Sequence, residues 1–192
     1  MKIAITGHSK GIGKACFDVL SKDHNVIGFS RSNGFNITQP RKIFIASMDC
    51  DVFINNAYIM DTKDQINLFN LFFEQWKDDP NKFIVNIGSK SKYYPYNPNM
   101  PNLTANFRSG KGYNDNKTDL AEVTYDKQLF TPKKCRITNI NPGYTNTDLV
   151  ARLVNEVNML SPEEVANTVK WVIEQPTHIE IGDLGIWHPS ER

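Results

Sequence analysis

Short apolar runs alternate with longer stretches of helical periodicity along most of this 192-residue chain. Runs rich in Val, Ile and Phe predict six β-strands, at residues 2–6, 25–30, 51–55, 82–87, 136–141 and 178–187. Apolar positions at helical spacing predict helices at residues 14–21, 64–77, 113–130 and 163–174. The last helix opens on a capping box with proline at the first helical position, Ser161-Pro162-Glu163-Glu164. Strands that are apolar on both faces and alternate with helices predict an α/β fold, a doubly wound parallel sheet flanked by helices on both faces.

Two connections between these elements stand out. No helix is predicted between the second and third strands. The stretch 90–112 holds three prolines, many asparagines and several aromatic side chains. Prolines lower the entropy cost of ordering a loop, so we predict an ordered cap over the substrate or a subunit contact rather than a linker. The whole chain, 1–192, is predicted to form a single domain that carries this insert.

The charge balance of the chain narrows the classes of partner. Lys and Arg total 22 against 21 acidic residues, a formal net charge of +1, which argues against a role in neutralising nucleic-acid phosphates. No apolar run reaches the length of a membrane span, and the first residues enter a strand at once, which leaves no room for a secretory signal. Three cysteines without paired spacing and four scattered histidines predict no disulfide, no metal site and a cytoplasmic location.

The link between the first strand and the first helix is rich in glycine and reads Thr6-Gly7-His8-Ser9-Lys10-Gly11-Ile12-Gly13. A dinucleotide fingerprint needs this strand–loop–helix context, because it binds a pyrophosphate at the helix N-terminus. Gly7 permits a sharp turn, Gly11 a close approach to the pyrophosphate, and Gly13 close packing of helix and strand. A glycine-rich turn without a ligand is the alternative. Ala15 after Lys14, together with the wrong spacing, excludes a Walker A phosphate loop.

The TGxxxGxG spacing resembles the short-chain dehydrogenase/reductase family, which has a Rossmann-type fold. Further motifs follow in the family's order over essentially the whole chain: Asn55-Asn56-Ala57, Ile66-Asn67-Leu68, Asn86-Ile87-Gly88-Ser89, Tyr113-Asn114-Asp115-Asn116-Lys117 and Asn141-Pro142-Gly143-Tyr144-Thr145-Asn146-Thr147-Asp148-Leu149. They are similar to the NNAG motif, the VNL stretch, the catalytic-serine segment, the YxxxK pair and the segment after the sixth strand. Tyr58 departs from the family, because it stands where the NNAG motif has its last glycine. The chain is also shorter than is usual for the family.

The resemblance implies a catalytic tetrad made of Asn67, Ser89, Tyr113 and Lys117. Tyr113 and Lys117 stand four residues apart, so both project from one face of a helix. The unperturbed pKa of tyrosine is about 10, and a nearby ammonium and the positive nicotinamide ring are expected to lower it. Tyr113 is then the general acid/base, and Ser89 donates to the substrate oxygen. Lys117 holds the ribose, and Asn67 holds a water that feeds protons to Lys117. A surface, turn-forming or packing role is the alternative for Tyr113, Ser89 and Asn67.

The implied cofactor is NADP(H). An NAD site needs an acid after the second strand, whereas that place here carries Arg31, which suits a 2′-phosphate. Lys10 supplies a second cation. We predict that the residues in contact with the cofactor are Thr6, Gly7, Ser9, Lys10, Gly11, Ile12, Gly13, Arg31, Asn36, Ile37, Asn55, Asn56, Ala57, Tyr113, Lys117, Pro142, Gly143, Thr145 and Thr147.

Two of these residues have alternative roles. Asn55 is expected to support the cofactor loop and to fix the neighbouring strand, with turn formation as the alternative. Thr147 is expected to bond the carboxamide, to cap the helix that follows, or to do both.

The sequence thus predicts an NADP(H)-dependent oxidoreductase that transfers a hydride between nicotinamide and a carbonyl or secondary alcohol. Its partners are a small-molecule substrate and further copies of the chain, in a homodimer or homotetramer, with no nucleic acid and no membrane. A non-catalytic NADP(H)-binding sensor or partner-binding module is the main alternative, because such a protein needs the glycines and Arg31 without the tetrad. A sugar-nucleotide epimerase of the related extended branch ranks below both. No residue identifies the substrate.

Overall fold

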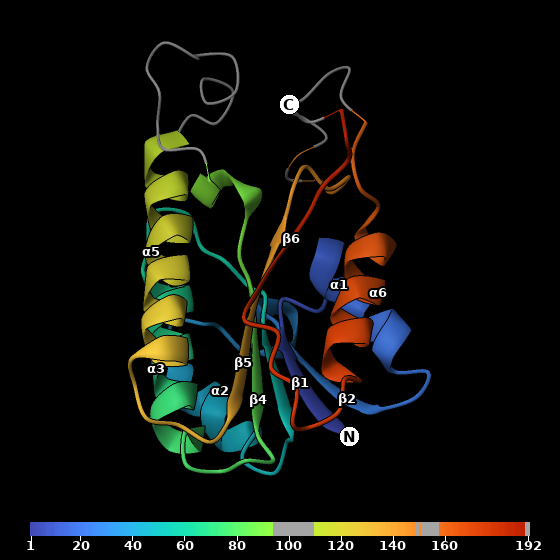
Figure 1. The fold of residues 1–192 in the computed structure, drawn as a ribbon. Helices are drawn as coiled ribbons and strands as arrows, with labels where there is room; N and C mark the ends of the chain where they lie inside the picture. The colour runs from blue at the N-terminus through green and yellow to red at the C-terminus, as the bar shows by residue number, and fades with distance from the viewer. Residues whose placement is uncertain (94–109, 149, 151–157, 191–192) are drawn as a thin grey trace.

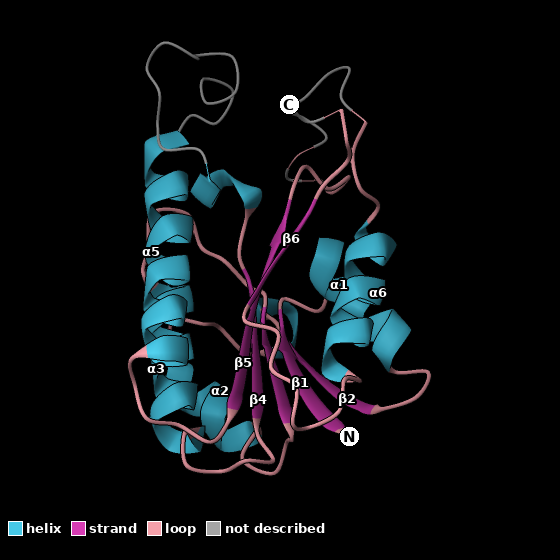
Figure 2. Ribbon diagram, viewed as in Figure 1, coloured by secondary structure: helices cyan, strands magenta, loops and turns pink. Residues whose placement is uncertain are grey.

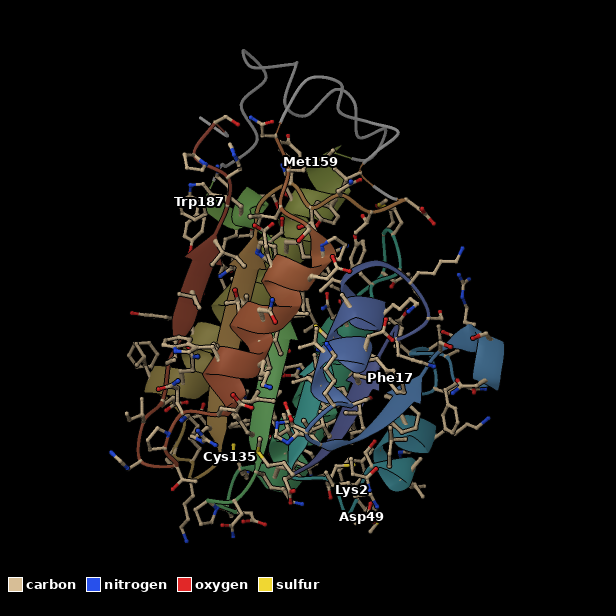
Figure 3. The ribbon with its side chains drawn as sticks, turned by 90° about the vertical axis from the view of Figure 1, so that its right-hand side faces the viewer. Lys2, Phe17, Asp49, Cys135, Met159 and Trp187 are labelled. Atoms are coloured by element: carbon tan, nitrogen blue, oxygen red, sulfur yellow. The ribbon has the colours of Figure 1, made fainter. Side chains whose placement is uncertain are left out.

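The computed structural model describes residues 1–93, 110–148, 150 and 158–190. Six parallel strands form one sheet in the order β2-β1-β3-β4-β5-β6 (Figures 1 and 2). They span Lys2–Thr6 (β1), Asn25–Phe29 (β2), Val52–Asn55 (β3), Phe83–Ile87 (β4), Arg136–Pro142 (β5) and Asp183–Ile186 (β6). Because all strands run in one direction, their carboxyl ends share one edge of the sheet. Figure 3 shows Lys2, at the start of β1, at one end of the molecule and Trp187, directly after β6, at the other.

Helices cover both faces of the sheet (Figure 1). One face carries α1 and α6, and the opposite face carries α2, α3 and α5. They span Gly11–Leu20 (α1), Pro40–Ala46 (α2), Asp64–Trp76 (α3), Gly110–Leu129 (α5) and Pro162–Ile173 (α6), with short 3₁₀ turns at Arg31–Asn33 (η1) and Lys90–Tyr93 (η2). The predicted fold class, a doubly wound parallel sheet between two helical layers, is confirmed.

Two hydrophobic cores lie against the two faces of the sheet. Ile3 and Ile5 of β1 belong to the core under α1 and α6, whereas Ala4 belongs to the core under α2, α3 and α5. This alternation follows from the two-residue period of a strand. In the second core, the rings of Phe53 and Phe72 stack with their centroids 3.6 Å apart. Apolar burial on both faces fixes the register of the strands whose ends carry the candidate site.

The ends of some elements differ from those predicted. The prediction of no helix between the second and third strands is wrong, because α2 lies there, with Pro40 at its N-terminus and Ile43 buried. Seven residues are too few to give a clear helical period, which explains the error. The last strand is shorter than predicted, and α5 begins three residues before Tyr113. The capping box of α6 is present, since the Ser161 hydroxyl accepts from the Glu164 N–H at 3.2 Å.

The predicted cap at 90–112 falls largely outside the described residues. Its first residues form η2, its last residues open α5, and residues 94–109 lie between the described ranges. The role of this segment stays a prediction. Among the described residues, none of the helices combines the length and the apolar character needed to cross a membrane.

Candidate active site

The glycine loop lies at the point where the strand order of the sheet changes direction. The chain passes from β1 to β2 on one side, and the remaining strands follow on the other side, starting with β3. Such a switch point, at the carboxyl ends of the strands, is where open α/β sheets bind ligands. Thr6 joins the two sides, because its hydroxyl accepts from the N–H groups of Asn56 and Ala57 at 3.1 and 3.0 Å. The Asn56 side chain donates back to the Thr6 carbonyl at 2.9 Å.

The backbone of the loop has the form that a pyrophosphate needs. Gly7 and Gly11 have positive φ angles, +74° and +52°, which favour glycine. A Cβ atom on Gly13 would overlap the Gly7 carbonyl, so α1 packs against the loop only with glycine there. At the start of α1, Lys10 makes no capping hydrogen bond through its side chain, and the first turn carries no acid. The N–H groups of this helix end are therefore suited to an anionic ligand, and the residues present fit a dinucleotide.

The predicted cations both lie at this edge. Arg31 is the first residue of η1, directly after β2 and Ser30; it is exposed, and no residue in the described ranges pairs with it. Ser9 and Lys10 are also exposed, and Lys10 lies 4.0 Å from the Asp148 carboxylate. Among the described residues, neither Arg31 nor Lys10 forms a close ion pair, so both side chains are accessible to an anionic ligand.

Three other predicted cofactor residues serve the fold through their side chains. Ile37 is buried in the hydrophobic core, so only its backbone is placed to meet a ligand. Asn36 accepts from the Thr38 N–H at 3.2 Å, which forms a local turn. Ile12 packs on the opposite core.

The segment after β5 returns to the glycine loop. Pro142 ends β5, and the Gly143 N–H donates to the Ile186 carbonyl at 2.7 Å. Thr145 is buried and forms a β-bridge with Leu160. The methyl group of Thr147 lies 3.2 Å from where a Cβ on Gly11 would stand. Sequence-distant parts of the predicted cofactor site therefore meet. The predicted capping role of Thr147 stays a prediction, because residues 149 and 151–157 of the segment that follows lie outside the described ranges.

Three residues of the predicted tetrad come together between β4 and α5. Ser89 lies two residues beyond β4, and a hydrogen bond joins its hydroxyl to the Tyr113 phenol. Lys117 lies one turn further along α5, with Nζ 5.8 Å from the centroid of the Tyr113 ring. Its ammonium is buried and donates to the Ile87 carbonyl at 3.1 Å and to Oε1 of Gln65 at 2.9 Å.

Burial governs the electrostatics of this cluster. Removal from water lowers the pKa of Lys117 to about 7. Burial also raises the pKa of Tyr113, against the opposing effect of the hydrogen bond from Ser89. Within the chain itself the pKa of Tyr113 therefore moves in the direction opposite to the predicted lowering, because burial and the neighbouring Tyr58 outweigh the hydrogen bond from Ser89. The contribution of a nicotinamide cation stays a prediction.

The structure does not bring the side chain of Asn67 to Lys117. Asn67 is exposed on α3, whereas Gln65 is buried and contacts Lys117. Residues two apart on a helix lie about 200° apart around its axis, so the two side chains face opposite sides. The spacing of Gln65 with Leu68, Phe69 and Phe72 already places it on the apolar face of this helix, and that signal identifies it from the sequence.

Two asparagines at the end of β3 make different contacts. Asn55, the last residue of the strand, donates from its side-chain amide to the Asn86 side chain at 2.9 Å and so holds the neighbouring strand. The hydrogen bond to the glycine loop comes from Asn56, because successive residues at a strand end point in opposite directions.

Tyr58, the departure from the NNAG motif, belongs to this cluster. Its ring meets the Tyr113 ring edge-on, with 5.3 Å between centroids, and lies 4.8 Å from the Lys117 ammonium. The Asn116 amide donates to its hydroxyl at 3.3 Å. A large aromatic side chain therefore takes the place of the family's glycine beside the catalytic candidates.

Sequence reasoning also missed a polar cluster behind Ser89. The Asp183 carboxylate accepts from the side chains of Asn139, Asn141 and Tyr93 at 3.1, 2.9 and 2.8 Å, and pairs with Lys92. Burial acts to raise the pKa of Asp183, but these partners outweigh it and hold the pKa below its ordinary value. The cluster ties η2 to β5 and β6. Its members lie far apart in the sequence, which carries no local signal for it.

The described residues contain no group of three His, Cys, Asp or Glu side chains placed to hold a metal ion. Cys16, Cys50 and Cys135 are buried free thiols, and burial raises the pKa of each.

The chain is similar in part of its sequence, and in its fold, to known dehydrogenases. No family model matches the chain. The serine 3-dehydrogenase of Agrobacterium fabrum (strain C58 / ATCC 33970) is 27% identical over 113 residues, which cover 53% of this chain and 41% of that protein. The chain thus spans less than half the length of this curated relative.

Two solved structures share the fold over nearly the full chain. A serine dehydrogenase in its closed form, complexed with NADP+, has a TM-score of 0.75 at 15% identity, covering 100% of this chain and 96% of the other. The 3-alpha-hydroxysteroid dehydrogenase from Pseudomonas sp. B-0831, complexed with NADH, has a TM-score of 0.74 at 18% identity, covering 97% and 95%. Identities this low show the fold alone. Together with the sequence match, the shared fold confirms the predicted resemblance to the short-chain dehydrogenase/reductase family.

Proposed function

We propose that the protein is an NADP(H)-dependent oxidoreductase acting on a carbonyl or secondary alcohol. The observation that carries the proposal is the meeting of Ser89, Tyr113 and Lys117 at the same sheet edge as the glycine loop. Dehydrogenase relatives with the same fold support the reaction class.

The chain's own residues would handle the proton and the substrate oxygen. The nicotinamide, when bound, supplies or accepts the hydride. The Tyr113 phenol gives its proton to the substrate oxygen during reduction and takes it back during oxidation. The Ser89 hydroxyl donates to the same oxygen, and its hydrogen bond to Tyr113 already holds the two hydroxyls together. Lys117 has three N–H donors, of which Gln65 and Ile87 take two, so one is suited to a ribose hydroxyl.

The remaining cofactor contacts lie along the sheet edge. The N–H groups at the start of α1 would hold the pyrophosphate, and Asn56 and Thr147 would border it from either side.

The preference for NADP(H) over NAD(H) rests on Arg31. Its exposed guanidinium at the end of β2 is suited to bidentate bonds with a 2′-phosphate, and Lys10 adds a second positive charge nearby. The relatives differ in this respect, since one is complexed with NADP+ and another with NADH. The preference is therefore argued from this chain's residues.

A non-catalytic NADP(H)-binding module is the second candidate, and Tyr58 favours it. A ring packed on Tyr113 and Lys117 restricts the space beside both catalytic candidates. In such a module the same groups would report cofactor binding to a partner and would not turn over a substrate.

A single set of measurements on the purified chain separates the two functions. NADPH and NADH are titrated by fluorescence, and NADPH oxidation or NADP+ reduction is followed by absorbance over a panel of alcohols and carbonyls. Serine opens the panel, because the curated relative is a serine 3-dehydrogenase, and a 3α-hydroxysteroid and an aldohexose follow from the structural relatives. We expect NADPH to bind more tightly than NADH and at least one substrate to react. Tight NADPH binding with no turnover on any substrate would favour the module.

We also propose assembly into a homodimer or homotetramer. Light scattering on the purified chain measures this directly, and a monomeric mass would contradict it.

A further inference from the structure

Gln65 occupies a buried junction between four elements. It is the second residue of α3 and is 3% exposed. Its side-chain amide donates to the carbonyl of Asn55 at the end of β3 and to that of Ile87 at the end of β4, at 2.9 and 3.1 Å. Its side-chain oxygen accepts from Lys117 of α5 at 2.9 Å, and its main-chain carbonyl accepts from the Asn55 amide at 3.0 Å. Every polar group of the side chain is therefore engaged.

These partners fix the orientation of the Gln65 amide. Carbonyl oxygens only accept hydrogen bonds, so the NH₂ group must face Asn55 and Ile87. The Oε1 atom is then the one that faces Lys117, and a flipped amide would set an oxygen against two carbonyl oxygens. The acceptor offered to Lys117 is held from two strands.

Lys117 depends on this acceptor because it has no carboxylate beside it in the described part of the chain. The titratable groups that face its ammonium are the phenols of Tyr58 and Tyr113, whose rings lie 4.8 and 5.8 Å away. Asp119, half a turn further along α5, pairs with Lys63. Two neutral dipoles, Gln65 Oε1 and the Ile87 carbonyl, hold a buried amine that burial has brought to a pKa of about 7.

We propose that Gln65 is a positioning residue that holds the Lys117 ammonium against Tyr113. This inference rests on the proposed function, because it gives Lys117 its place in the same site. Gln65 makes a direct side-chain bond where the resemblance implied a water held by Asn67. A neutral amide directs the amine without an ion pair, so Lys117 keeps the ability to gain and lose a proton near neutral pH. A glutamate there would stabilise the charged form.

The test measures the titration of Lys117 itself. The protein is labelled with [ε-¹³C]lysine, and the Lys117 resonance is assigned by its loss in Lys117→Arg. We expect a midpoint near pH 7 in the parent. Gln65→Glu should raise the midpoint by about one pH unit or more, and Gln65→Met should lower it by about one pH unit, because one variant adds a carboxylate and the other removes a dipole. Circular dichroism confirms that each variant is folded.

Two further variants test whether the effect on Lys117 is specific to Gln65 among the polar residues of α3. Asn67→Ala tests the residue predicted from the family, and Gln75→Glu adds a carboxylate at an exposed position of the same helix. Both should leave the Lys117 midpoint within about 0.3 pH units of the parent, since neither faces the amine. A shift with Asn67→Ala as large as that with Gln65→Met would overturn the proposal, as would an unmoved midpoint in folded Gln65→Glu.

A measurement on the unmodified chain keeps the proposal testable if the Gln65 variants do not fold. The side-chain NH₂ resonances of Gln65 should shift with the same midpoint as the Lys117 carbon, whereas those of Gln75 should not. Independent midpoints would contradict a direct bond.

If a substrate is found, steady-state measurement of kcat and KM provides a further test. Gln65→Met should lower kcat by about 10-fold or more with little change in the KM for substrate, and Gln75→Glu should stay within about twofold. If no substrate reacts with the parent, the proposed function fails while the titrations still decide the role of Gln65.

Discussion

Two regions at the carboxyl edge of the sheet are held together in different ways: the glycine loop after β1, and the cluster around Lys117 between β4 and α5. At the ends of β1 and β3, the N–H groups of Asn56 and Ala57 donate to the Thr6 hydroxyl at 3.1 and 3.0 Å, and Gly13 packs closely against the Gly7 carbonyl. Between β4 and α5, side chains from distant parts of the sequence surround a buried amine. The backbone therefore fixes the proposed pyrophosphate loop on the first side, whereas burial shifts the pKa values of Tyr113 and Lys117 on the second side.

This difference matches a division of labour between binding and chemistry. A pyrophosphate is recognised by fixed N–H groups, so rigidity is sufficient on the first side. Proton transfer near neutral pH is favoured by pKa values close to that pH. Burial brings the pKa of Lys117 there but raises that of Tyr113, so the proposed mechanism needs the bound nicotinamide cation to lower the pKa of Tyr113. Substitutions on each side should therefore fail in different ways.

The largest expected effect comes from removing the proton donor. Tyr113→Phe deletes the phenolic hydroxyl and keeps the ring, so turnover should fall by roughly 100- to 10,000-fold while NADPH binding is retained. Steady-state rates and fluorescence titration measure the two quantities. The matched control is Tyr125→Phe, an exposed tyrosine of the same helix, which should retain full activity. Comparable rates for Tyr113→Phe and the parent would remove Tyr113 from the mechanism.

Gly13→Ala should damage the binding side instead. The new Cβ would overlap the Gly7 carbonyl, and strain of about 1–3 kcal/mol corresponds to NADPH binding weakened by roughly 10- to 100-fold. Gly34→Ala is the control, because its φ of +83° is strained by about 1 kcal/mol but its Cβ meets no neighbour. Fluorescence titration and thermal unfolding are measured for both. Equal NADPH affinities in the two variants would show that the close packing of α1 is not needed for binding.

Arg31→Ala should change which cofactor is preferred. Loss of a charge-assisted bond to a 2′-phosphate should weaken NADPH binding by roughly 10- to 100-fold and leave NADH binding unchanged. Arg41→Ala, at an exposed position of α2, is the matched control and should alter neither affinity. Tighter NADH than NADPH binding in the parent would refute the predicted specificity.

Features that one short stretch of backbone determines were predictable from the sequence. The six strands and the glycine loop follow from local apolar runs and from glycines at fixed spacing, and the structure contains all of them. The missed α2 marks the limit of this approach, since seven residues give too few turns for a period to show.

Features that depend on how distant side chains meet were not predictable in the same way. The resemblance of Ile66-Asn67-Leu68 to a family motif points to Asn67 as the residue that acts on Lys117. The helical spacing of the buried positions instead places Gln65 on the face that contacts Lys117. The Asp183 cluster joins η2, β5 and β6, which only the tertiary fold brings together.

Lys117→Met should reveal the buried amine through the pH dependence of stability. The pKa of Lys117 is about 7 in the folded chain and 10.5 ordinarily. Below about pH 7 the amine is protonated in both the folded and unfolded states, so its destabilising contribution is constant and fully present. Between about pH 7 and 10.5 the unfolded chain holds a proton that the folded chain has lost, and the free energy of unfolding rises with pH by up to about 1.4 kcal/mol per unit.

The Lys117→Met variant should lack this rise in the free energy of unfolding, whereas Lys22→Met, at an exposed position, should keep it. Urea unfolding at pH 7, 8 and 9 measures the slopes, and equal slopes in the two variants would mean that Lys117 keeps its charge when the chain folds.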